Sequence, residues 1–326
     1  MLPMTASDRA AMSIIIIVPE SLETVRKTMD HLRAQVGKAR LELVFVAPSS
    51  QHVCVSGEDL PGFAGVCLVE VDTMRSAGQA KATGVQRANA PLVAFAEDHS
   101  YPEPGWALAL IEAYQGQVAA VGPELVNANP DSAVGWASMY ADFGPTIEPV
   151  VGGQTERLPW HNSSYRRELL LAYGAELPFM LDVEGILHAD LRRKGYALYL
   201  EPKARTHHLN ISLVSSFFQE QFYGGRLFAA SQAKYHNWSR WKRFLRIVSA
   251  PLVPWVRLRR ALRDMVRSGR GRLFPRIAPL LIFGLVFHAS GEFFGYALGL
   301  GDALQQRFVL EFHRERHVKK REKANG

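Results

Sequence analysis

The sequence predicts an α/β fold with a mostly parallel sheet, followed by a basic and apolar helical region. Short apolar runs alternate with helical patterns up to about residue 125, which is typical of βαβ units with parallel strands. The net charge of +7 gathers late in the chain, because Asp264 is the only acidic residue between residues 240 and 276. We therefore expect an α/β domain over residues 1–235 and a helical region over residues 236–326.

The α/β part begins with four predicted strands. The β-branched run at residues 14–18 is the first strand, residues 22–36 have helical spacing, and residues 41–46 form a second strand that Pro48 ends. The third strand covers residues 66–71, an alanine-rich helix covers residues 76–90, and the fourth strand covers residues 91–96. Open α/β sheets bind ligands beyond the carboxyl ends of their strands. Residues directly after these strands are therefore candidates for a binding site.

Three such residues directly follow the predicted fourth strand. Glu97, Asp98 and His99 offer carboxylate oxygens and an imidazole, the ligands that a divalent cation can take when it bridges two phosphates. The alternative is that the triplet is only a solvated turn. The residues around it decide between these two interpretations.

Residues 80–106 resemble the centre of glycosyltransferase family 2. They include Ala-Lys-Ala-Thr-Gly, then Arg-Ala-Asn-Ala-Pro-Leu-Val-Ala-Phe-Ala-Glu-Asp-His, then Pro-Glu-Pro-Gly-Trp. The resemblance implies a GT-A nucleotide-binding fold, a nucleotide-diphosphate sugar as donor, and Mn²⁺ or Mg²⁺ as cofactor. The chain departs from the family at Lys81, where the family has Arg, and at Glu97 and His99, where it has Asp.

A second ordered block extends the resemblance to about residue 230. It contains Asn-Ser-Ser-Tyr-Arg-Arg from Asn162, which the family places at a helix start, then a helix ending at Gly195, and a strand ending near a histidine. Counting back from Gly195 places Glu184 in the family's catalytic-base position, with Asp182 in reserve. An inverting transferase needs such a base to remove a proton from the acceptor hydroxyl. The alternative for both carboxylates is a structural place at a helix N-terminus.

The resemblance also implies roles for other residues. The implied donor-binding residues are Pro19, Glu20, Lys81, Glu97, Asp98 and Arg226; the implied metal ligands are Asp98, His99 and His208; and the implied acceptor contacts are Trp106, His161 and Asn162. Three of these have plain structural alternatives. Glu20 could serve in packing or capping, His208 could be a satisfied strand-end residue, and Arg226 could lie on a surface helix.

The C-terminal region has features of a membrane-associated segment. Residues 277–300 are about long enough to span a bilayer, but His288 and Glu292 interrupt them and basic residues flank both ends. Basic flanks prefer the cytoplasmic side of a membrane, and a single crossing would place one of the two on the other side. A shallow helical hairpin or re-entrant segment therefore fits better. Residues 244–265 mix Trp255 and aliphatic residues with arginines, which suits an anionic lipid surface. The alternative is a soluble pair of helices that forms a homo-oligomer.

These patterns predict an inverting glycosyltransferase on the cytoplasmic face of the inner membrane. Its partners would be a nucleotide-diphosphate sugar, a glycan or lipid-linked acceptor, and an anionic membrane surface. The main alternative is a noncatalytic membrane-bound scaffold with a degenerate nucleotide-sugar fold, which Lys81 and Val183 favour because both depart from the family. A nucleic-acid partner is disfavoured, because the arginines alternate with large aliphatic residues and no nucleic-acid module is visible.

Overall fold

The computed structural model describes residues 10–48, 60–71 and 74–323. The chain forms two compact units: unit 1 comprises residues 1–125 and 150–207, and unit 2 comprises residues 126–149 and 208–326. Residues 126–149 and 208–235 thus group with the C-terminal helices. The expected boundary at residue 235 separates a catalytic domain from a membrane-associating region. This functional division stays a prediction.

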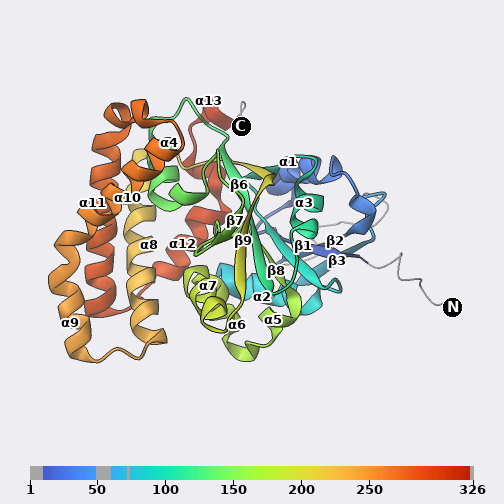
Figure 1. Cartoon of the computed structure of the whole chain (residues 1–326), viewed down its shortest axis with the longest axis horizontal. Helices are drawn as coiled ribbons and strands as arrows, with labels where there is room; N and C mark the ends of the chain where they lie inside the picture. Colours follow the sequence, from blue (N-terminus) through green and yellow to red (C-terminus); the bar gives the residue numbers. More distant parts are fainter. Residues whose placement is uncertain (1–9, 49–59, 72–73, 324–326) are drawn as a thin grey trace. The chain divides into compact units, whose positions relative to one another are not determined.

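Unit 1 is built on a mixed sheet whose strands lie in the order β3-β2-β1-β4-β8-β6-β9-β5, with β7 paired to β9 (Figure 1). Strands β1 to β4 pair in parallel, and β8 runs antiparallel to β4 and β6. The predicted α/β fold with a mostly parallel sheet is confirmed. The strands are β1 (Met12–Ile17), β2 (Leu41–Ala47), β3 (Gly65–Glu70), β4 (Leu92–Ala96), β5 (Ser100–Pro102), β6 (Val118–Asn127), β7 (Gly153–Thr155), β8 (Ser164–Arg166) and β9 (Ala197–His208).

The helices of unit 1 follow the predicted order, with one correction. They are α1 (Leu22–Arg33), α2 (Ala77–Arg87), α3 (Trp106–Glu112), α5 (Arg167–Leu171), α6 (Leu177–Asp182) and α7 (Glu184–Arg193). The predicted helix start at Asn162 is wrong, because Ser164 to Arg166 form strand β8 and α5 begins at Arg167. The backbone of Ser164 pairs with both β4 and β6, so this segment completes the sheet before the helix begins.

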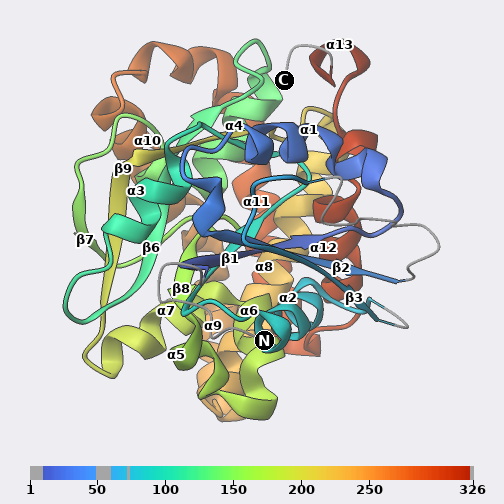
Figure 2. The same ribbon diagram turned by 90° about the vertical axis from the view of Figure 1, so that its right-hand side faces the viewer.

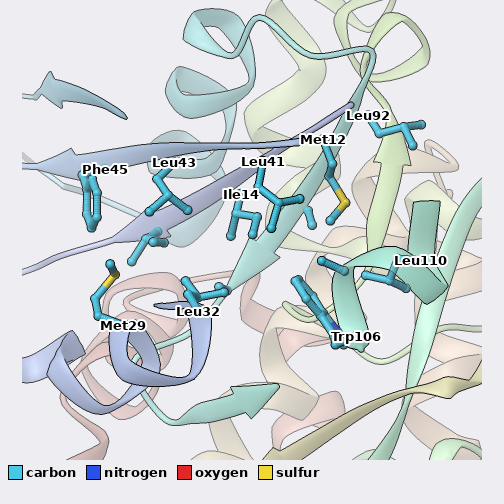
Figure 3. Close-up of a cluster of buried hydrophobic side chains, with 14 of the residues drawn as sticks. Met12, Ile14, Met29, Leu32, Leu41, Leu43, Phe45, Leu92, Trp106 and Leu110 are labelled. Atoms are coloured by element: carbon cyan, nitrogen blue, oxygen red, sulfur yellow. The ribbon is translucent and has the colours of Figure 1, made fainter. Parts of the chain in front are cut away.

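Helices cover both faces of the parallel part of the sheet (Figure 2). On one face, Ile14 lies in a hydrophobic cluster with Met29 and Leu32 of α1 (Figure 3). On the other face, Ile15 packs against α2 at Gly84, where a Cβ atom would come within 2.5 Å of the isoleucine side chain. Successive side chains of a strand point to opposite faces. This explains why the run that predicted β1 is apolar without alternation.

Unit 2 is mainly helical. Its helices are α4 (Ala133–Asp142), α8 (Val214–Tyr235), α9 (Arg240–Ser249), α10 (Val253–Arg267), α11 (Phe274–Leu298), α12 (Ala303–Phe312) and α13 (Lys320–Lys323). Because α11 is one continuous helix, the predicted hairpin within residues 277–300 is wrong. Within the described ranges, Gly271–Leu298 is the one helical stretch long and apolar enough to cross a membrane, and 44% of its apolar window is buried in the protein. Length and composition alone therefore do not decide whether it meets a membrane.

Glycines bring α8 and α11 into backbone contact along their length. A Cβ atom at Gly225 of α8 would lie 2.1 Å from the carbonyl oxygen of His288. A Cβ atom at Gly291 of α11 would lie 2.0 Å from the carbonyl oxygen of Phe222. Neither separation is possible for a real side chain, so larger residues at these positions would force the two helices apart.

We expect Gly225→Ala to lower the free energy of unfolding by about 1–3 kcal/mol, because the added methyl group overpacks a backbone contact. The neighbouring Gly224 is a matched control, since its Cβ would meet nothing nearer than Arg307 Nη1 at 3.9 Å. Gly224→Ala should leave stability unchanged or raise it by about 0.5–1 kcal/mol through the better helix propensity of alanine. Chemical denaturation measures both, and equal effects of the two substitutions would contradict the close helix approach.

Candidate active site

Buried polar groups follow the carboxyl end of β4 in unit 1. The side chains of Glu97, Asp98 and His99 are all buried. Glu97 Oε2 accepts hydrogen bonds from Asn162 Nδ2 over 2.6 Å and from Ser100 Oγ over 2.7 Å. Asp98 Oδ1 lies 2.5 Å from His99 Nδ1, and His99 Nε2 lies 3.7 Å from Glu97 Oε2. The cluster is therefore held in place by hydrogen bonds from two further residues.

The chemistry of this cluster fits a divalent cation. When the Nδ1–H group of His99 donates to Asp98, the lone pair of the imidazole lies on Nε2, which is the atom nearer Glu97. Ligands about 2.1 Å from one ion lie about 3 Å or more apart, consistent with the 3.7 Å separation of Nε2 from Glu97 Oε2. Asp98 would then orient the imidazole, as carboxylates do for many metal-binding histidines. The alternative is a protonated His99 paired with both carboxylates.

Glu184, the first residue of α7, lies in a buried network of polar groups. Its Oε1 atom forms an ion pair with Lys81 Nζ at 2.6 Å, and its Oε2 atom accepts a hydrogen bond from the Tyr165 hydroxyl over 2.9 Å. The backbone N–H of His161 donates to the same carboxylate over 3.2 Å, and the His161 ring contacts Lys81 Nζ. A buried carboxylate needs such partners, since an unpaired charge in the interior is strongly destabilising.

The pKa of Glu184 is lower than its ordinary value. Burial alone raises this pKa, but the nearby Lys81, His161 and His188 lower it by more. Glu184 is therefore ionised at neutral pH, the state that can accept a proton. One of its present donors must give way before an acceptor hydroxyl can reach it.

Tyr165 and His188 complete the network around Glu184 and were missed by the sequence analysis as site residues. The Tyr165 hydroxyl lies 2.9 Å from His188 Nε2, and burial lowers the pKa of His188 to about 4. A neutral His188 with its proton on Nε2 can donate to Tyr165, which donates in turn to Glu184. The spacing of His188 four residues after Glu184, one helical turn, was the available signal.

Asp182, the predicted reserve base, holds the N-terminus of α2. Its Oδ1 atom accepts from the backbone N–H of Gly78 over 2.7 Å, and its Oδ2 atom accepts from Ser76 Oγ over 2.9 Å. Ser76 is also the N-cap of α2, because its hydroxyl accepts from the backbone N–H of Gln79. These contacts favour the structural interpretation of Asp182, which the sequence analysis had left open.

We expect the contribution of Asp182 to stability to decrease as pH rises. Burial raises its pKa from 3.8 to about 6, so the folded chain binds this proton more tightly than the unfolded chain. The contribution is fully present below pH 3.8 and is lost as pH rises through about 6. Relative to Asp182→Asn, which cannot titrate, the unfolding free energy of the wild type should fall by roughly 2 kcal/mol from pH 4 to pH 7. Urea denaturation of both proteins over this range measures the difference, and parallel pH curves would contradict it.

The other predicted residues of unit 1 have different environments. Pro19 and Glu20 follow β1, and Glu20 is exposed. Trp106 is 2% exposed and its ring packs in the hydrophobic core (Figure 3). This position gives no support to the predicted acceptor contact of Trp106. His161 and Asn162, by contrast, contact the predicted base Glu184 and the predicted donor-binding residue Glu97, respectively.

Two predicted residues belong to unit 2. Arg226 Nε donates to the carbonyl oxygen of Gly299 over 3.0 Å, and Nη1 lies 3.5 Å from Asp302. In unit 2 the arginine therefore holds the C-terminal end of α11, which favours the structural alternative. His208 ends β9 and is buried, and its Nδ1 atom lies 3.0 Å from Asn210 Oδ1. A hydrogen bond from Nδ1 to Asn210 leaves the lone pair of the ring on Nε2.

Residues 13–174 match the family model described as Glycosyl transferase family 2. The chain belongs to this family. The matched segment includes Lys81, the Glu97–His99 cluster and Asn162, and it ends before Asp182 and Glu184. Membership of this family supports a role in glycosyl transfer. No curated protein matched the sequence.

A solved glycosyltransferase structure shares the fold. A mannosyltransferase, PcManGT from Pyrobaculum calidifontis in complex with GDP-Man and Mn²⁺, is 14% identical with a TM-score of 0.54, over 92% of this chain and 87% of that chain. GalNAc-T7 with UDP, GalNAc and Mn²⁺ is 13% identical with a TM-score of 0.46, over 61% of this chain and 43% of that chain, so this protein spans less than half of it. The first similarity supports the fold alone. Together with the family match, it confirms the predicted GT-A fold.

Proposed function

We propose that the protein is an inverting glycosyltransferase that moves a sugar from a nucleotide-diphosphate sugar to a hydroxyl group. The main support is the pair of consecutive residues His161 and Asn162. The N–H of His161 donates to Glu184, and the side chain of Asn162 donates to Glu97, so one short segment joins the proposed base to the proposed metal-binding cluster. His161 has a φ of 64°, a left-handed conformation that is uncommon outside glycine and concentrates at functional sites.

In the proposed mechanism, Glu184 removes the proton of the acceptor hydroxyl as that oxygen attacks the anomeric carbon. The bond from this carbon to the diphosphate oxygen breaks on the opposite face, so the configuration inverts. The lowered pKa of Glu184 supports the role, because the carboxylate enters the reaction ionised. The hydroxyl of Tyr165 and the backbone N–H of His161 hold the Glu184 carboxylate in position. The acceptor hydroxyl meanwhile replaces Lys81 as the partner of this carboxylate.

We propose that Glu97 and His99 hold Mn²⁺ or Mg²⁺, that Asp98 orients His99, and that His208 is a further candidate ligand. The Mn²⁺ in the structure of the similar mannosyltransferase supports this choice. A bound cation would stabilise the negative charge on the departing diphosphate. Lys81, once released from Glu184, would contact a phosphate, and Pro19 and Glu20 would lie near the nucleotide.

We also propose that the acceptor is a glycan or a lipid-linked molecule and that the enzyme works at the cytoplasmic face of a membrane, in cell-envelope polysaccharide synthesis. The support is the basic and apolar character of unit 2, where exposed arginines and exposed aromatic residues are close in sequence, as Arg240 and Trp241 are. A membrane location would keep the enzyme beside a lipid-linked acceptor.

A noncatalytic nucleotide-sugar scaffold is the second candidate function. The observation that favours it is the ion pair between Glu184 and Lys81, in which the side chains are only 1% and 2% exposed. A carboxylate with all its partners inside the protein could serve folding alone. The two functions differ in whether a donor is consumed.

A donor screen tests the proposal first. The melting temperature of the purified full-length protein is measured with UDP, GDP, CDP and dTDP, each with and without Mn²⁺ or Mg²⁺, because a ligand of the folded state raises it by mass action. Metal-dependent stabilisation by one diphosphate is the expected result. The matching sugar nucleotides are then tested for turnover, and binding without any turnover would favour the scaffold. No stabilisation by any of the four would contradict the enzymatic proposal and favour a scaffold with a degenerate nucleotide-sugar fold.

A further inference from the structure

An exposed apolar stripe runs along α11 in unit 2. The exposed residues of α11 occur mostly in adjacent pairs, and helical spacing places these pairs on one face of the helix. Every exposed residue of α11 after Arg276 is uncharged. The largest members of the stripe are Ile282, Phe283, Val286, Phe287, Phe293, Phe294 and Leu298. From residue 282 to residue 298 the stripe is about 24 Å long at 1.5 Å per residue. Contiguous apolar surface of this size marks an interaction site in a folded protein.

The two ionisable residues in the middle of α11 are on the opposite face, against α8. His288 and Glu292 are buried and lie 3.4 Å apart, from Nε2 to Oε1. The backbone at His288 meets Gly225 of α8, and α8 also carries buried Glu220 and half-buried Arg226. A transmembrane α11 would draw this polar helix into the hydrocarbon with it, at a high cost. Contact from one side exposes only the apolar stripe to lipid.

Helices α9 and α10 add a second exposed apolar surface beside α11 (Figure 1). Ile247 of α9 packs in one cluster with Tyr296 of α11. This surface extends from Trp241 of α9, which is 67% exposed, through the turn at Ala250–Leu252 to Trp255 of α10, which is 72% exposed. Between them lie Phe244, Leu245, Val248 and Leu252, all at least 49% exposed. Tryptophan at such a surface is typical of a membrane interface.

The charge on these helices selects the kind of lipid. Arg240, Arg259, Arg260 and Arg263 are exposed, and within the described part of the chain the structure shows no hydrogen bond or ion pair from their side chains. A helix that alternates exposed arginines with tryptophan suits an anionic headgroup layer above hydrocarbon. An interface between two copies of this chain would bring these arginines close to their own equivalents.

We propose that α9, α10 and the outer face of α11 together form a one-sided docking surface for an anionic lipid bilayer. The stripe of α11 enters the outer part of the acyl chains, the arginines of α9 and α10 bind the headgroups, and no helix crosses the membrane. This refines the proposed membrane location and does not depend on sugar transfer.

The first test is flotation of the full-length protein with preformed vesicles of phosphatidylcholine, with or without phosphatidylglycerol. We expect strong binding only when phosphatidylglycerol is present, and weaker binding at high salt. The triple variant Arg259→Gln/Arg260→Gln/Arg263→Gln should bind on the order of a hundredfold more weakly. Trp241→Ser/Trp255→Ser should lose binding even at low salt. Arg26→Gln and Val151→Ser, at exposed positions of unit 1, are matched controls that should bind like the wild type.

The second test separates docking from crossing. Arg272→Cys and Gln305→Cys place a thiol at exposed positions before and after α11, each in a background of Cys54→Ser and Cys67→Ser. With vesicle-bound protein, a membrane-impermeant maleimide should label both positions from outside. Labelling at only one position would show that α11 crosses the membrane. Equal binding to neutral vesicles, or a dimer in place of vesicle binding, would also overturn the proposal.

Discussion

Glu184→Gln is expected to abolish sugar transfer and to destabilise the protein in the same step. Loss of a general base lowers the rate by about 10²–10⁴-fold. Loss of the buried carboxylate leaves Lys81 as an uncompensated cation, which costs about 3–5 kcal/mol of unfolding free energy. Both side chains are almost fully buried, at 1% and 2% exposure, so water cannot replace the missing partner. Initial rates with the donor found by the screen, and urea denaturation, measure the two effects.

The double variant Lys81→Met/Glu184→Gln separates catalysis from folding. With both charges removed, most of the lost stability should return, because no unpaired ion remains in the interior. Activity should stay absent. Activity that returned together with stability would show that Glu184 serves the fold and is not the base.

Tyr165→Phe is the matched control for this site. It removes one hydrogen bond to Glu184 and keeps the carboxylate and its ion pair. We expect the free energy of unfolding to fall by about 1–3 kcal/mol, because the N–H donor of His188 loses the Tyr165 oxygen as its acceptor. The transfer rate should fall far less than in Glu184→Gln. A similar fall in both variants would assign the catalytic effect to the network as a whole.

The sequence predicted those parts of the fold that depend on local patterns. The apolar runs identified β1 to β4 within a few residues, and the position of Glu97 to His99 followed from the end of β4. The pairing of Lys81 with Glu184 joins residues 103 positions apart, and no local pattern encodes such a contact. The burial of the Trp106 ring in the core likewise could not be predicted from a local pattern. Its burial depends on α1 and the sheet, which only the folded chain brings together.

The predicted hairpin at residues 277–300 was wrong for a physical reason. The hairpin was predicted because basic residues flank both ends of the segment and because His288 and Glu292 would be costly in hydrocarbon. In the structure these two residues are buried on the face that packs against α8. One unbroken helix can therefore keep its polar residues inside the protein and its apolar stripe outside.

His99→Ala is expected to remove the metal dependence of donor binding. If Glu97 and His99 are the ligands, deletion of the imidazole should weaken Mn²⁺ affinity by at least about a hundredfold, since a second-shell partner alone contributes 10–100-fold. Calorimetric titration of Mn²⁺ into the protein with the stabilising diphosphate measures this affinity. Under the alternative, in which a protonated His99 pairs with Glu97 and Asp98, the substitution would change stability and leave the titration unaltered.

Asp98→Asn distinguishes the two possible roles of Asp98. As an orienting group behind His99, Asp98 should contribute about 10–100-fold to metal affinity, less than the histidine itself. A greater loss in Asp98→Asn than in His99→Ala would make Asp98 the ligand, as the family resemblance first implied. Ser100→Ala is the control, because it removes one hydrogen bond to Glu97 Oε2 while Asn162 still holds that oxygen. Since all the candidate ligands remain in this control, its affinity should stay within a few-fold of the wild type, so a larger loss would show that the position of Glu97 limits metal binding.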